Sequence, residues 1–157
     1  MADLPAIGFI GLGTMGLPMA ALVQGAGYGL NIVDFDPPLP QQLLDGGARV
    51  RATNRQVAEV ADIVALMVPD TPDVETVLFA DDGVAAGLRP GSTVVDMSSI
   101  SPAATIDFAH RINDLGCDYL DAPVSGGAPR AMTGELTIMV GGPQATFDRA
   151  LPLLQTM

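Results

Sequence analysis

Lysine is missing from this chain of 157 residues, whose seven basic residues are all arginine. Acidic residues number 18, which gives a formal net charge of −11. Nucleic-acid binding depends on a basic surface that neutralises phosphates, so this balance argues against a nucleic-acid partner. A nucleotide remains compatible with the charge, because backbone amides at the start of a helix bind phosphate without side-chain cations.

Cysteine and histidine each occur once. The lone Cys117 cannot form a disulfide within the chain, and no cluster of residues has metal-ligand spacing, so no metal site is predicted. Cys117 precedes an apolar stretch, and we expect it to be a small buried side chain. His110 falls in an expected helix without an acid/base partner, and we assign it no catalytic role.

Long hydrophobic runs are absent as well, because the apolar segments have the length of strands and fall far short of a membrane span. Residues 1–5 contain neither a basic region nor an apolar signal core, so we expect a cytoplasmic protein with no membrane partner. The length fits one domain, residues 1–157, and a hydrophobic content of 48% is typical of a globular chain.

Apolar stretches alternate with helical patterns along the chain. This alternation predicts an α/β fold of Rossmann type, with a mainly parallel, doubly wound sheet between two layers of helices. The expected strands cover residues 7–10, 30–33, 63–68, 93–97, 117–121 and 136–140. The expected helices cover residues 15–26, 38–45, 55–60, 74–79 and 103–115, and a last helix ends near residue 155. Asn54 is favoured over Thr53 as the N-cap of the third helix, and Ser101 before Pro102 is typical of a helix start.

The motif around which the chain is organised is a glycine triplet, Gly11, Gly13 and Gly16, between the first expected strand and the first expected helix. In that context the spacing G-x-G-x-x-G is a dinucleotide-binding fingerprint. The first glycine permits a tight turn, the second lets the backbone approach a pyrophosphate, and the third lets the helix pack close to the strand. An ordinary glycine-rich turn is the alternative, but it does not require this spacing.

Asp34 follows the second expected strand, close to the position about 20 residues past the fingerprint where an acidic residue binds the ribose hydroxyls. Asp36 is the second candidate, and the alternative for Asp34 is a turn or cap acid before Pro37. Phe35 lies where NADP-preferring sites commonly carry an arginine, and the Asp34 carboxylate would repel the 2′-phosphate of NADP. The sequence therefore predicts NAD as the cofactor, with NADP less favoured.

Four segments match a known family in their order and spacing. They are GLGTMGLPMA at 11–20, DMSSISP at 96–102, DAPVSGG at 121–127 and GELTIMVGG at 134–142. Together they resemble the β-hydroxyacid dehydrogenase family, which includes 3-hydroxyisobutyrate dehydrogenases and tartronate semialdehyde reductases. The resemblance covers essentially the whole chain.

The resemblance implies roles for individual residues. The pyrophosphate loop would comprise Gly11, Leu12, Gly13, Thr14, Met15 and Gly16, with Asp34 at the adenosine ribose. Further cofactor contacts would come from Val68, Pro69 and Asp73, and from Ser99 at the position of a threonine near the nicotinamide. The substrate carboxylate would be bound by Ser125, Gly126 and Gly127. Arg130 is either an additional contact to an anionic substrate or, as we favour, a solvent-facing side chain.

The resemblance also implies a general acid/base lysine and an all-helical second domain, and this chain contains neither. We therefore expect the cofactor-binding half of an NAD-dependent oxidoreductase, inactive by itself, that would interconvert a 3-hydroxy acid with the corresponding semialdehyde or keto acid. The parent enzyme is expected to be a homo-oligomer that takes a small carboxylate substrate. The alternatives are a non-catalytic nucleotide-binding module, and a relative of imine reductases or of 6-phosphogluconate dehydrogenase. The segment 121–127 argues against the imine reductases.

Overall fold

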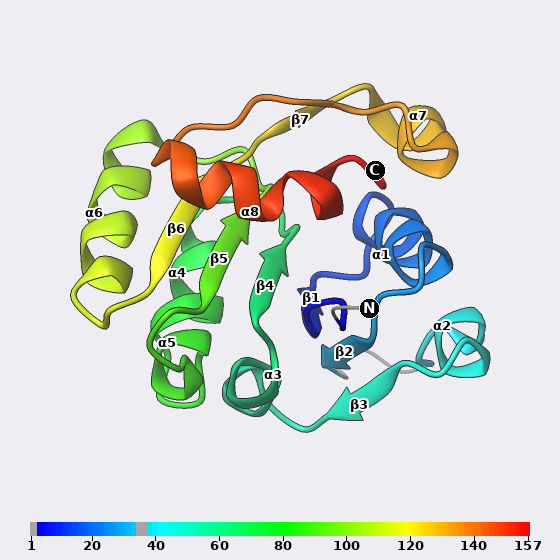
Figure 1. Ribbon diagram of the computed structural model, residues 1–157, viewed down its shortest axis with the longest axis horizontal. Helices are drawn as coiled ribbons and strands as arrows, with labels where there is room; N and C mark the ends of the chain where they lie inside the picture. Colours follow the sequence, from blue (N-terminus) through cyan, green and yellow to red (C-terminus); the bar gives the residue numbers. More distant parts are fainter. Residues whose placement is uncertain (1–2, 34–37) are drawn as a thin grey trace.

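Six parallel strands form the sheet at the centre of the fold (Figure 1). The computed structural model describes residues 3–33 and 38–157. The strands are β1 (Ile7–Ile10), β2 (Leu30–Val33), β3 (Arg49–Arg51), β4 (Ile63–Leu66), β5 (Thr93–Asp96) and β6 (Asp118–Asp121). Their order in the sheet, β3-β2-β1-β4-β5-β6, is that of the Rossmann fold. The predicted fold class is thereby confirmed.

The four central strands β2, β1, β4 and β5 are buried at every position. Such continuous burial is typical of parallel strands covered on both faces, and it explains their runs of branched apolar residues. Strand β1 pairs with β2 on one side and with β4 on the other. The direction in which the chain adds strands therefore reverses between β1 and β4, and ligands of open α/β sheets bind outside the carboxyl ends of strands at such a point.

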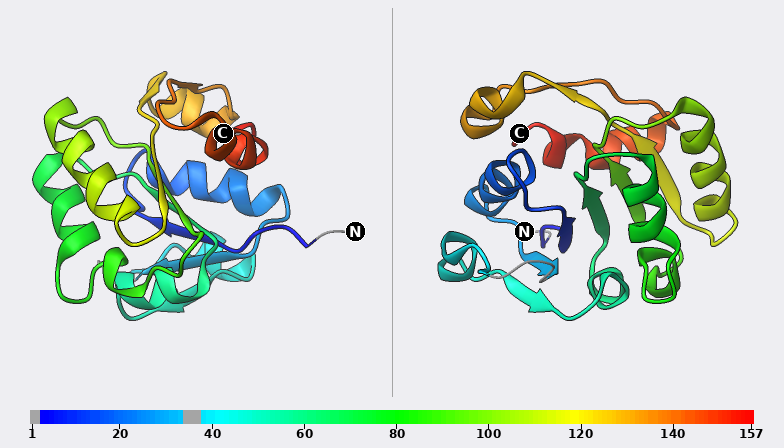
Figure 2. Two further views of the ribbon diagram at one scale, coloured as in Figure 1. Left: turned by 60° about the vertical axis from the view of Figure 1, so that its left-hand side comes forward. Right: turned by 180° about the vertical axis from the view of Figure 1, so that it is seen from behind.

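Helices cover both faces of the sheet (Figure 2). One face carries α1 (Gly16–Gly25), α2 (Gln41–Asp45) and α8 (Gln144–Leu154). The other face carries α3 (Asn54–Val60), α4 (Thr71–Phe79), α5 (Val84–Gly87) and α6 (Pro102–Asn113). Phe9, Met19 and Leu120 are fully buried in the first layer, and Leu66 and Ile112 in the second. The two cores meet only through the sheet, which holds the carboxyl ends of its strands in fixed relative positions.

Several short elements were not predicted from the sequence. Strand β3 at the edge of the sheet has the burial pattern exposed, exposed, partly buried, so its sequence Arg-Val-Arg lacks the apolar run on which strand prediction depends. Helix α5 has only four residues, and its sequence Val-Ala-Ala-Gly does not form a recognisable stripe. Both elements are too short for the several repeats by which a strand or helix pattern is recognised.

The prediction that Asn54 caps the third helix is wrong. Thr53 is the N-cap of α3, and its side-chain oxygen accepts a hydrogen bond from the Gln56 backbone N–H at 3.2 Å. Asn54 is instead the first residue of the helix and is buried. Both residues are common N-caps, and the sequence alone did not distinguish their backbone conformations. Ser101 is the N-cap residue of α6 as predicted, but its side chain makes no capping hydrogen bond.

The chain leaves the sheet after β6 and returns to the end of that strand at Gly141. Backbone hydrogen bonds join Asp121 and Gly141 in both directions, at 3.0 and 2.7 Å, and close residues 122–140 into a loop. The loop contains β7 (Val124–Ser125), α7 (Gly127–Thr133) and β8 (Thr137–Ile138), and β7 pairs with β8 in antiparallel orientation. Helix α7 packs against α1 (Figure 1). A segment expected to be mainly loop and strand is therefore a small substructure above the main sheet.

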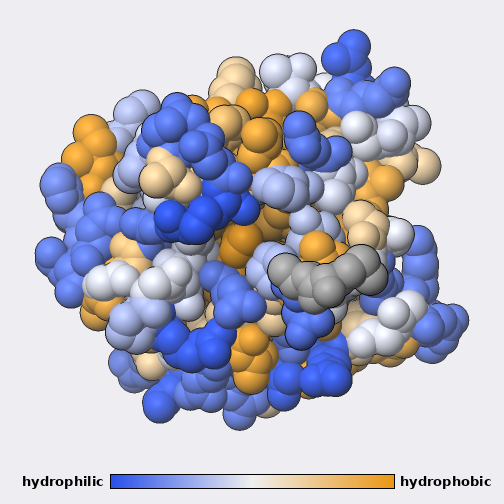
Figure 3. Space-filling view, in the orientation of Figure 1, coloured by the Kyte–Doolittle hydropathy of each residue, from blue (hydrophilic) through white to orange (hydrophobic). Residues whose placement is uncertain are grey.

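The surface view in Figure 3 shows apolar side chains in a furrow between α8 and the loop above it. The residues that line this furrow are Leu136, Ile138, Val140, Phe147, Leu151, Leu154 and Gln155. Among the helices of residues 3–33 and 38–157, none combines the length and the apolar character needed to span a bilayer.

Candidate functional site

The glycine loop follows β1 directly, and two of its glycines are required by the protein's own packing. Gly11 has a φ of +98°, and a Cβ at this position would lie 2.0 Å from the Met67 carbonyl oxygen. A Cβ at Gly16 would lie 1.7 Å from the Gly11 carbonyl oxygen. The chain thus turns sharply after β1 and starts α1 in contact with the turn, as the fingerprint predicts.

Gly13 differs from these two positions. A Cβ at Gly13 would meet no protein atom within 4 Å, and its φ is not positive. Neither steric fit nor backbone conformation explains this glycine, whereas close approach of a ligand to the backbone does. The N-cap of α1, Met15, makes no side-chain capping hydrogen bond, so the first N–H groups of this helix are not capped by a side chain. Such N–H groups and the positive end of the helix dipole favour a phosphate.

Two cavities lie on either side of the glycine loop. The first, of about 460 Å³, is lined by Gly11, Leu12, Gly13, Leu17, Val33, Pro38, Leu39 and Pro40. The second, of about 390 Å³, is lined by Gly11, Gly13, Thr14, Met15, Gly16, Met67, Val68, Pro69 and Ser99. Gly11 and Gly13 belong to both cavities, so the anion-favouring backbone lies at their junction. A ligand with two bulky ends and a central pyrophosphate matches this arrangement.

Most of the residues expected to bind the cofactor line these cavities. All six residues of the glycine loop do so, as do Val68, Pro69 and Ser99. Asp34, expected at the ribose, lies outside the described residues together with Phe35 and Asp36, although Val33 immediately before them lines the first cavity.

Asp73 is placed differently from the other expected cofactor contacts. Its carboxylate accepts a hydrogen bond from the Asp70 backbone N–H at 3.2 Å, while the Asp70 carboxylate accepts one from Thr71 N–H at 2.7 Å. The bond from Asp70 N–H to Asp73 is one half of a capping box at the start of α4, in which the Asp70 side chain also accepts from the Asp73 backbone. Asp73 lines neither cavity of the glycine loop. Helix capping accounts for this carboxylate without a ligand.

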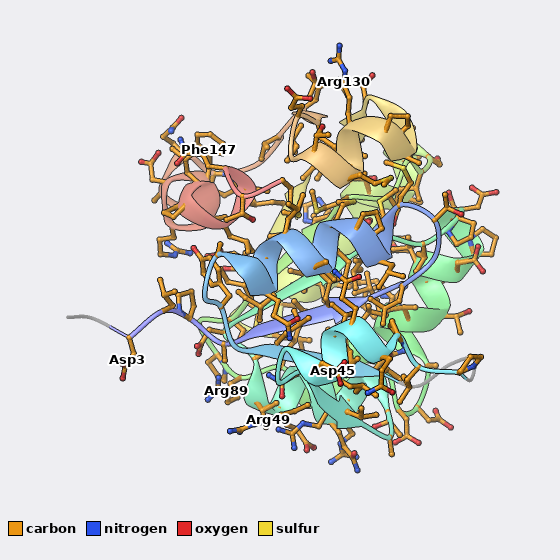
Figure 4. The ribbon with its side chains drawn as sticks, turned by 90° about the vertical axis from the view of Figure 1, so that its right-hand side faces the viewer. Asp3, Asp45, Arg49, Arg89, Arg130 and Phe147 are labelled. Atoms are coloured by element: carbon orange, nitrogen blue, oxygen red, sulfur yellow. The ribbon has the colours of Figure 1, made fainter. Side chains whose placement is uncertain are left out.

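The loop expected to bind a carboxylate occupies the start of α7. Ser125 is exposed at the end of β7, and Gly126 and Gly127 have φ values of +137° and +67°, which favour glycine. None of the three lines the cavities of the glycine loop. Figure 4 shows Arg130 pointing away from the body of the protein, in line with the expected solvent-facing role.

A groove on the outer side of α1 connects the two regions. It encloses about 490 Å³ and extends from Thr14 of the glycine loop to Ala128 and Met132 of α7. Thr14 also lines the second cavity, so the start of α7 and the glycine loop face a continuous surface.

A buried polar cluster, not recognised from the sequence as a unit, lies behind the second cavity. The Asp96 carboxylate accepts hydrogen bonds from the Tyr119 hydroxyl at 2.5 Å and from Ser98 N–H at 3.0 Å. Burial raises the pKa of Asp96, and the hydrogen bonds from Tyr119 and Ser98 act in the opposite direction. Burial and the Asp96 charge both raise the pKa of Tyr119. Burial and the same charge raise the pKa of Asp121. The sequence offered one signal only, a carboxylate at the end of an otherwise apolar strand.

The other titratable candidates are remote from the cavities. His110 is exposed on α6. Cys117 is buried, its thiol donates to the Arg89 carbonyl oxygen at 3.1 Å, and burial raises its pKa. Of the residues named as lining the two cavities, none is titratable in the physiological range. Within residues 3–33 and 38–157, no group of three or more His, Cys, Asp or Glu side chains has the geometry to hold a metal ion.

Comparison with known proteins agrees with this geometry. The NAD-binding domain of 6-phosphogluconate dehydrogenase is the family model that matches, over residues 6–157. The 2-hydroxy-3-oxopropionate reductase of Escherichia coli K12 is 51% identical over 151 residues, which are 96% of this chain and 51% of the relative. The mitochondrial 3-hydroxyisobutyrate dehydrogenase of Mus musculus is 36% identical over 157 residues, all of this chain and 47% of the relative.

Solved structures give the same result. The crystal structure of 3-hydroxyisobutyrate dehydrogenase from Salmonella typhimurium superposes with a TM-score of 0.89 at 39% identity, covering 96% of this chain and 53% of that one. The chain therefore spans about half the length of the relatives it matches. These matches confirm the resemblance to β-hydroxyacid dehydrogenases, and the chain belongs to the family of NAD-binding domains represented by that of 6-phosphogluconate dehydrogenase.

Proposed function

We propose that this chain is the cofactor-binding half of an NAD-dependent oxidoreductase that interconverts a 3-hydroxy acid and the corresponding semialdehyde or keto acid. The observation that carries the proposal is the pair of cavities that meet at Gly11 and Gly13, with a groove that runs from Thr14 to Ala128 at the start of α7. The reductase and dehydrogenase names of the full-length relatives support the reaction class.

In this proposal the chain's residues bind and orient the reactants. The backbone of residues 11–16 holds the pyrophosphate, and Asp34 holds the adenosine ribose. Val68, Pro69 and Ser99 form the wall against which the nicotinamide lies. NAD, when bound, accepts or donates the hydride. Ser125, Gly126 and Gly127 bind the substrate carboxylate through hydroxyl and backbone N–H groups, and Asp73 contributes at most a distant polar contact because it caps α4.

The proton of the substrate hydroxyl is not accounted for by this chain. Oxidation of a carbinol requires a positioned base for that proton. Among the described residues that line the cavities of the glycine loop none is titratable in the physiological range, and the chain has no lysine. We therefore expect the 157-residue chain alone to be inactive as a dehydrogenase. Turnover of a 3-hydroxy acid by the purified chain would show that the proton-transfer assignment is wrong.

Calorimetric titration of the chain with NAD, NADP and ADP-ribose tests the cofactor assignment directly. We expect NAD to bind more tightly than NADP, since the Asp34 carboxylate disfavours a 2′-phosphate. ADP-ribose should bind as well, because it carries the adenosine and pyrophosphate groups. Tighter binding of NADP would contradict the preference, and no binding of any of the three would overturn the proposed function.

Two alternatives keep the fold and change the function. A nucleotide-binding module without catalysis is favoured because none of the described residues that line the cavities is titratable in the physiological range. An imine reductase or a 6-phosphogluconate dehydrogenase relative would require a different substrate. Assays of the full-length protein with 3-hydroxy acids, imines and 6-phosphogluconate separate these cases, and only turnover of the first class supports our proposal.

We also propose that the parent enzyme is a cytoplasmic homo-oligomer. The partly buried apolar furrow between α8 and β8 supports association with further protein surface. Light scattering of the full-length protein and fractionation of cells test the two statements. A monomer in the first experiment, or a membrane-bound or secreted protein in the second, would contradict them.

A further inference from the structure

The wall of the second cavity begins where the β4–β5 ladder ends. The strands pair from Ile63 and Thr93 to Leu66 and Asp96, and the Met97 N–H donates to the Leu66 carbonyl oxygen at 2.9 Å. Beyond this bond, the described backbone has no further ladder contact between the two segments. The cavity residues Val68 and Ser99 lie just past that limit. Some other interaction must fix them relative to each other.

A side chain supplies the next connection. The Val68 N–H donates to the Ser98 hydroxyl oxygen at 3.0 Å, and Ser98 is fully buried. This bond joins the ends of β4 and β5 at the level of the cavity. Its geometry depends on the backbone of Ser98, because the direction of the side chain follows from that backbone.

The backbone of Ser98 is in turn held by Asp96. One carboxylate oxygen of Asp96 accepts the Ser98 N–H at 3.0 Å, and the other accepts the Tyr119 hydroxyl of β6 at 2.5 Å. Asp96 has no exposed surface and Tyr119 is 4% exposed. A buried carboxylate is costly unless it is hydrogen-bonded, so these two bonds fix its orientation strongly. A continuous chain of bonds thus runs from Tyr119 through Asp96 and Ser98 to Val68.

We propose that Asp96, Tyr119 and Ser98 are positioning residues that fix the wall of the nicotinamide-side cavity at Val68 and Ser99. They touch no ligand themselves in this assignment, and the inference rests on the proposed function. Ser98 turns its hydroxyl inward to Val68, while the next residue, Ser99, is exposed and lines the cavity. None of these three residues is named among those that line the adenosine-side cavity, which include Val33 and Leu39.

Apart from Gly11 and Gly13 the two cavities are lined by different residues, so measurements of ligand affinity can test the inference. ADP-ribose carries the adenosine, the pyrophosphate and the second ribose but lacks the nicotinamide ring, so in this assignment only NAD places a ring against Val68 and Ser99. Affinities of the 157-residue chain for both ligands are measured by calorimetry for Ser98→Ala, Tyr119→Phe and Asp96→Asn. Ser101→Ala is the matched control, because Ser101 is exposed and its side chain makes no capping bond.

We expect Ser98→Ala to weaken NAD binding by about tenfold, the equivalent of one hydrogen bond in the wall. ADP-ribose affinity should change less than about twofold. Tyr119→Phe should produce a smaller loss of the same kind, and Asp96→Asn should retain part of the wild-type preference because its amide oxygen still accepts the Ser98 N–H. Ser101→Ala should bind both ligands as the wild type does.

Three outcomes count against the inference. An equal loss of affinity for NAD and ADP-ribose would show that these residues are merely structural. Unchanged affinities for both ligands in Ser98→Ala and Tyr119→Phe would remove their positioning role while leaving the proposed function intact. A wild-type chain that binds neither ligand would overturn the proposed function and this inference with it. If Ser98→Ala does not fold, Tyr119→Phe decides.

Discussion

The two walls of the nucleotide cavities are built by different means. The glycine loop forms its wall from backbone, and packing permits it only because Cβ atoms are absent at Gly11 and Gly16. The wall at Val68 and Ser99 depends on side chains that form hydrogen bonds with one another behind the cavity. The first wall is therefore sensitive to added atoms, and the second to the removal of polar atoms.

This difference has an energetic reason. A backbone turn of fixed conformation is specified locally, and an intruding methyl group meets atoms that cannot move independently. A buried polar cluster is specified by partners from separate strands, and losing one partner leaves another polar group unsatisfied. Substitutions in the two walls should therefore lower stability or binding for different reasons, a steric clash in the first wall and a lost hydrogen bond in the second.

The largest effect is expected for Gly16→Ala. The new Cβ would lie 1.7 Å from the Gly11 carbonyl oxygen, so the loop or the helix must shift. We expect the free energy of unfolding to fall by at least about 3 kcal/mol in urea denaturation, well beyond a typical substitution. Gly25→Ala in the same helix is the control, since a Cβ there meets nothing within 4 Å. The control should gain up to about 1 kcal/mol, and equal stability of the two variants would contradict the steric argument.

Tyr119→Phe should destabilise the protein by removing a polar atom, whereas Gly16→Ala does so by adding a methyl group. Removing the hydroxyl leaves the buried Asp96 carboxylate with one donor fewer, and we expect a loss of about 1.5–3 kcal/mol near neutral pH. The dependence of the free energy of unfolding on pH tests whether the Tyr119 hydroxyl is the cause of this loss. Because burial and Asp96 raise the pKa of Tyr119 above its usual 10, its contribution to stability is complete below that pH and decreases as the pH rises further.

The wild-type chain should therefore lose about 1.4 kcal/mol per pH unit from this group above about pH 10, and Tyr119→Phe should lack that slope. The comparison is favourable because the chain has no lysine, so few other groups titrate there. Denaturation at several pH values measures both slopes. Parallel curves for the two proteins would argue against the buried hydrogen bond.

Gly13→Ala should separate binding from folding within the glycine loop itself. A Cβ at Gly13 meets no protein atom within 4 Å, so the free energy of unfolding should change by less than about 0.5 kcal/mol. The same Cβ projects where we expect the pyrophosphate, and NAD affinity should fall by tenfold or more, about 1.4 kcal/mol. Calorimetry and denaturation of one preparation measure both. Unchanged affinity would move the pyrophosphate away from Gly13.

The smallest effects concern two hydroxyls at helix starts. Thr53 accepts the Gln56 N–H and caps α3, so Thr53→Ala should cost about 1 kcal/mol. Ser101→Ala should stay within about 0.5 kcal/mol, because the Ser101 side chain does not cap α6. Thermal unfolding of the two variants compares them, and equal losses would mean that the capping geometry does not determine their stability.

The fold and the backbone wall were accessible from the sequence because their determinants are local. The expected strands 7–10 and 30–33 have the bounds found in the structure, since each is a short apolar run between turn residues. The glycine spacing identified the loop because all three residues lie within one turn and the start of its helix. Strand β3 was missed because an exposed edge strand with two arginines has no apolar pattern.

The side-chain wall was not accessible in the same way. Ser98 and Val68 are 30 positions apart and Tyr119 and Asp96 are 23 apart, so no local spacing relates them. Asp73 shows the converse case, in which the resemblance implies a cofactor contact and the structure shows a local capping box at the same carboxylate. Sequence motifs predicted the glycine loop that lines both cavities, whereas the hydrogen bonds behind the second cavity were found only in the packed strands.

The described residues that line the two cavities are uncharged, which affects how NAD affinity depends on ionic strength. The described residues that line them include no arginine, and the chain as a whole carries a net charge of −11. An anionic dinucleotide therefore approaches a protein of the same sign, and neutral backbone dipoles bind its pyrophosphate in our proposal. Salt screens that repulsion, with a Debye length of about 30 Å at 0.01 M and about 3 Å at 1 M. Affinity for NAD should rise modestly with salt over this range, in contrast to phosphate sites built from cationic side chains, whose ligands salt releases.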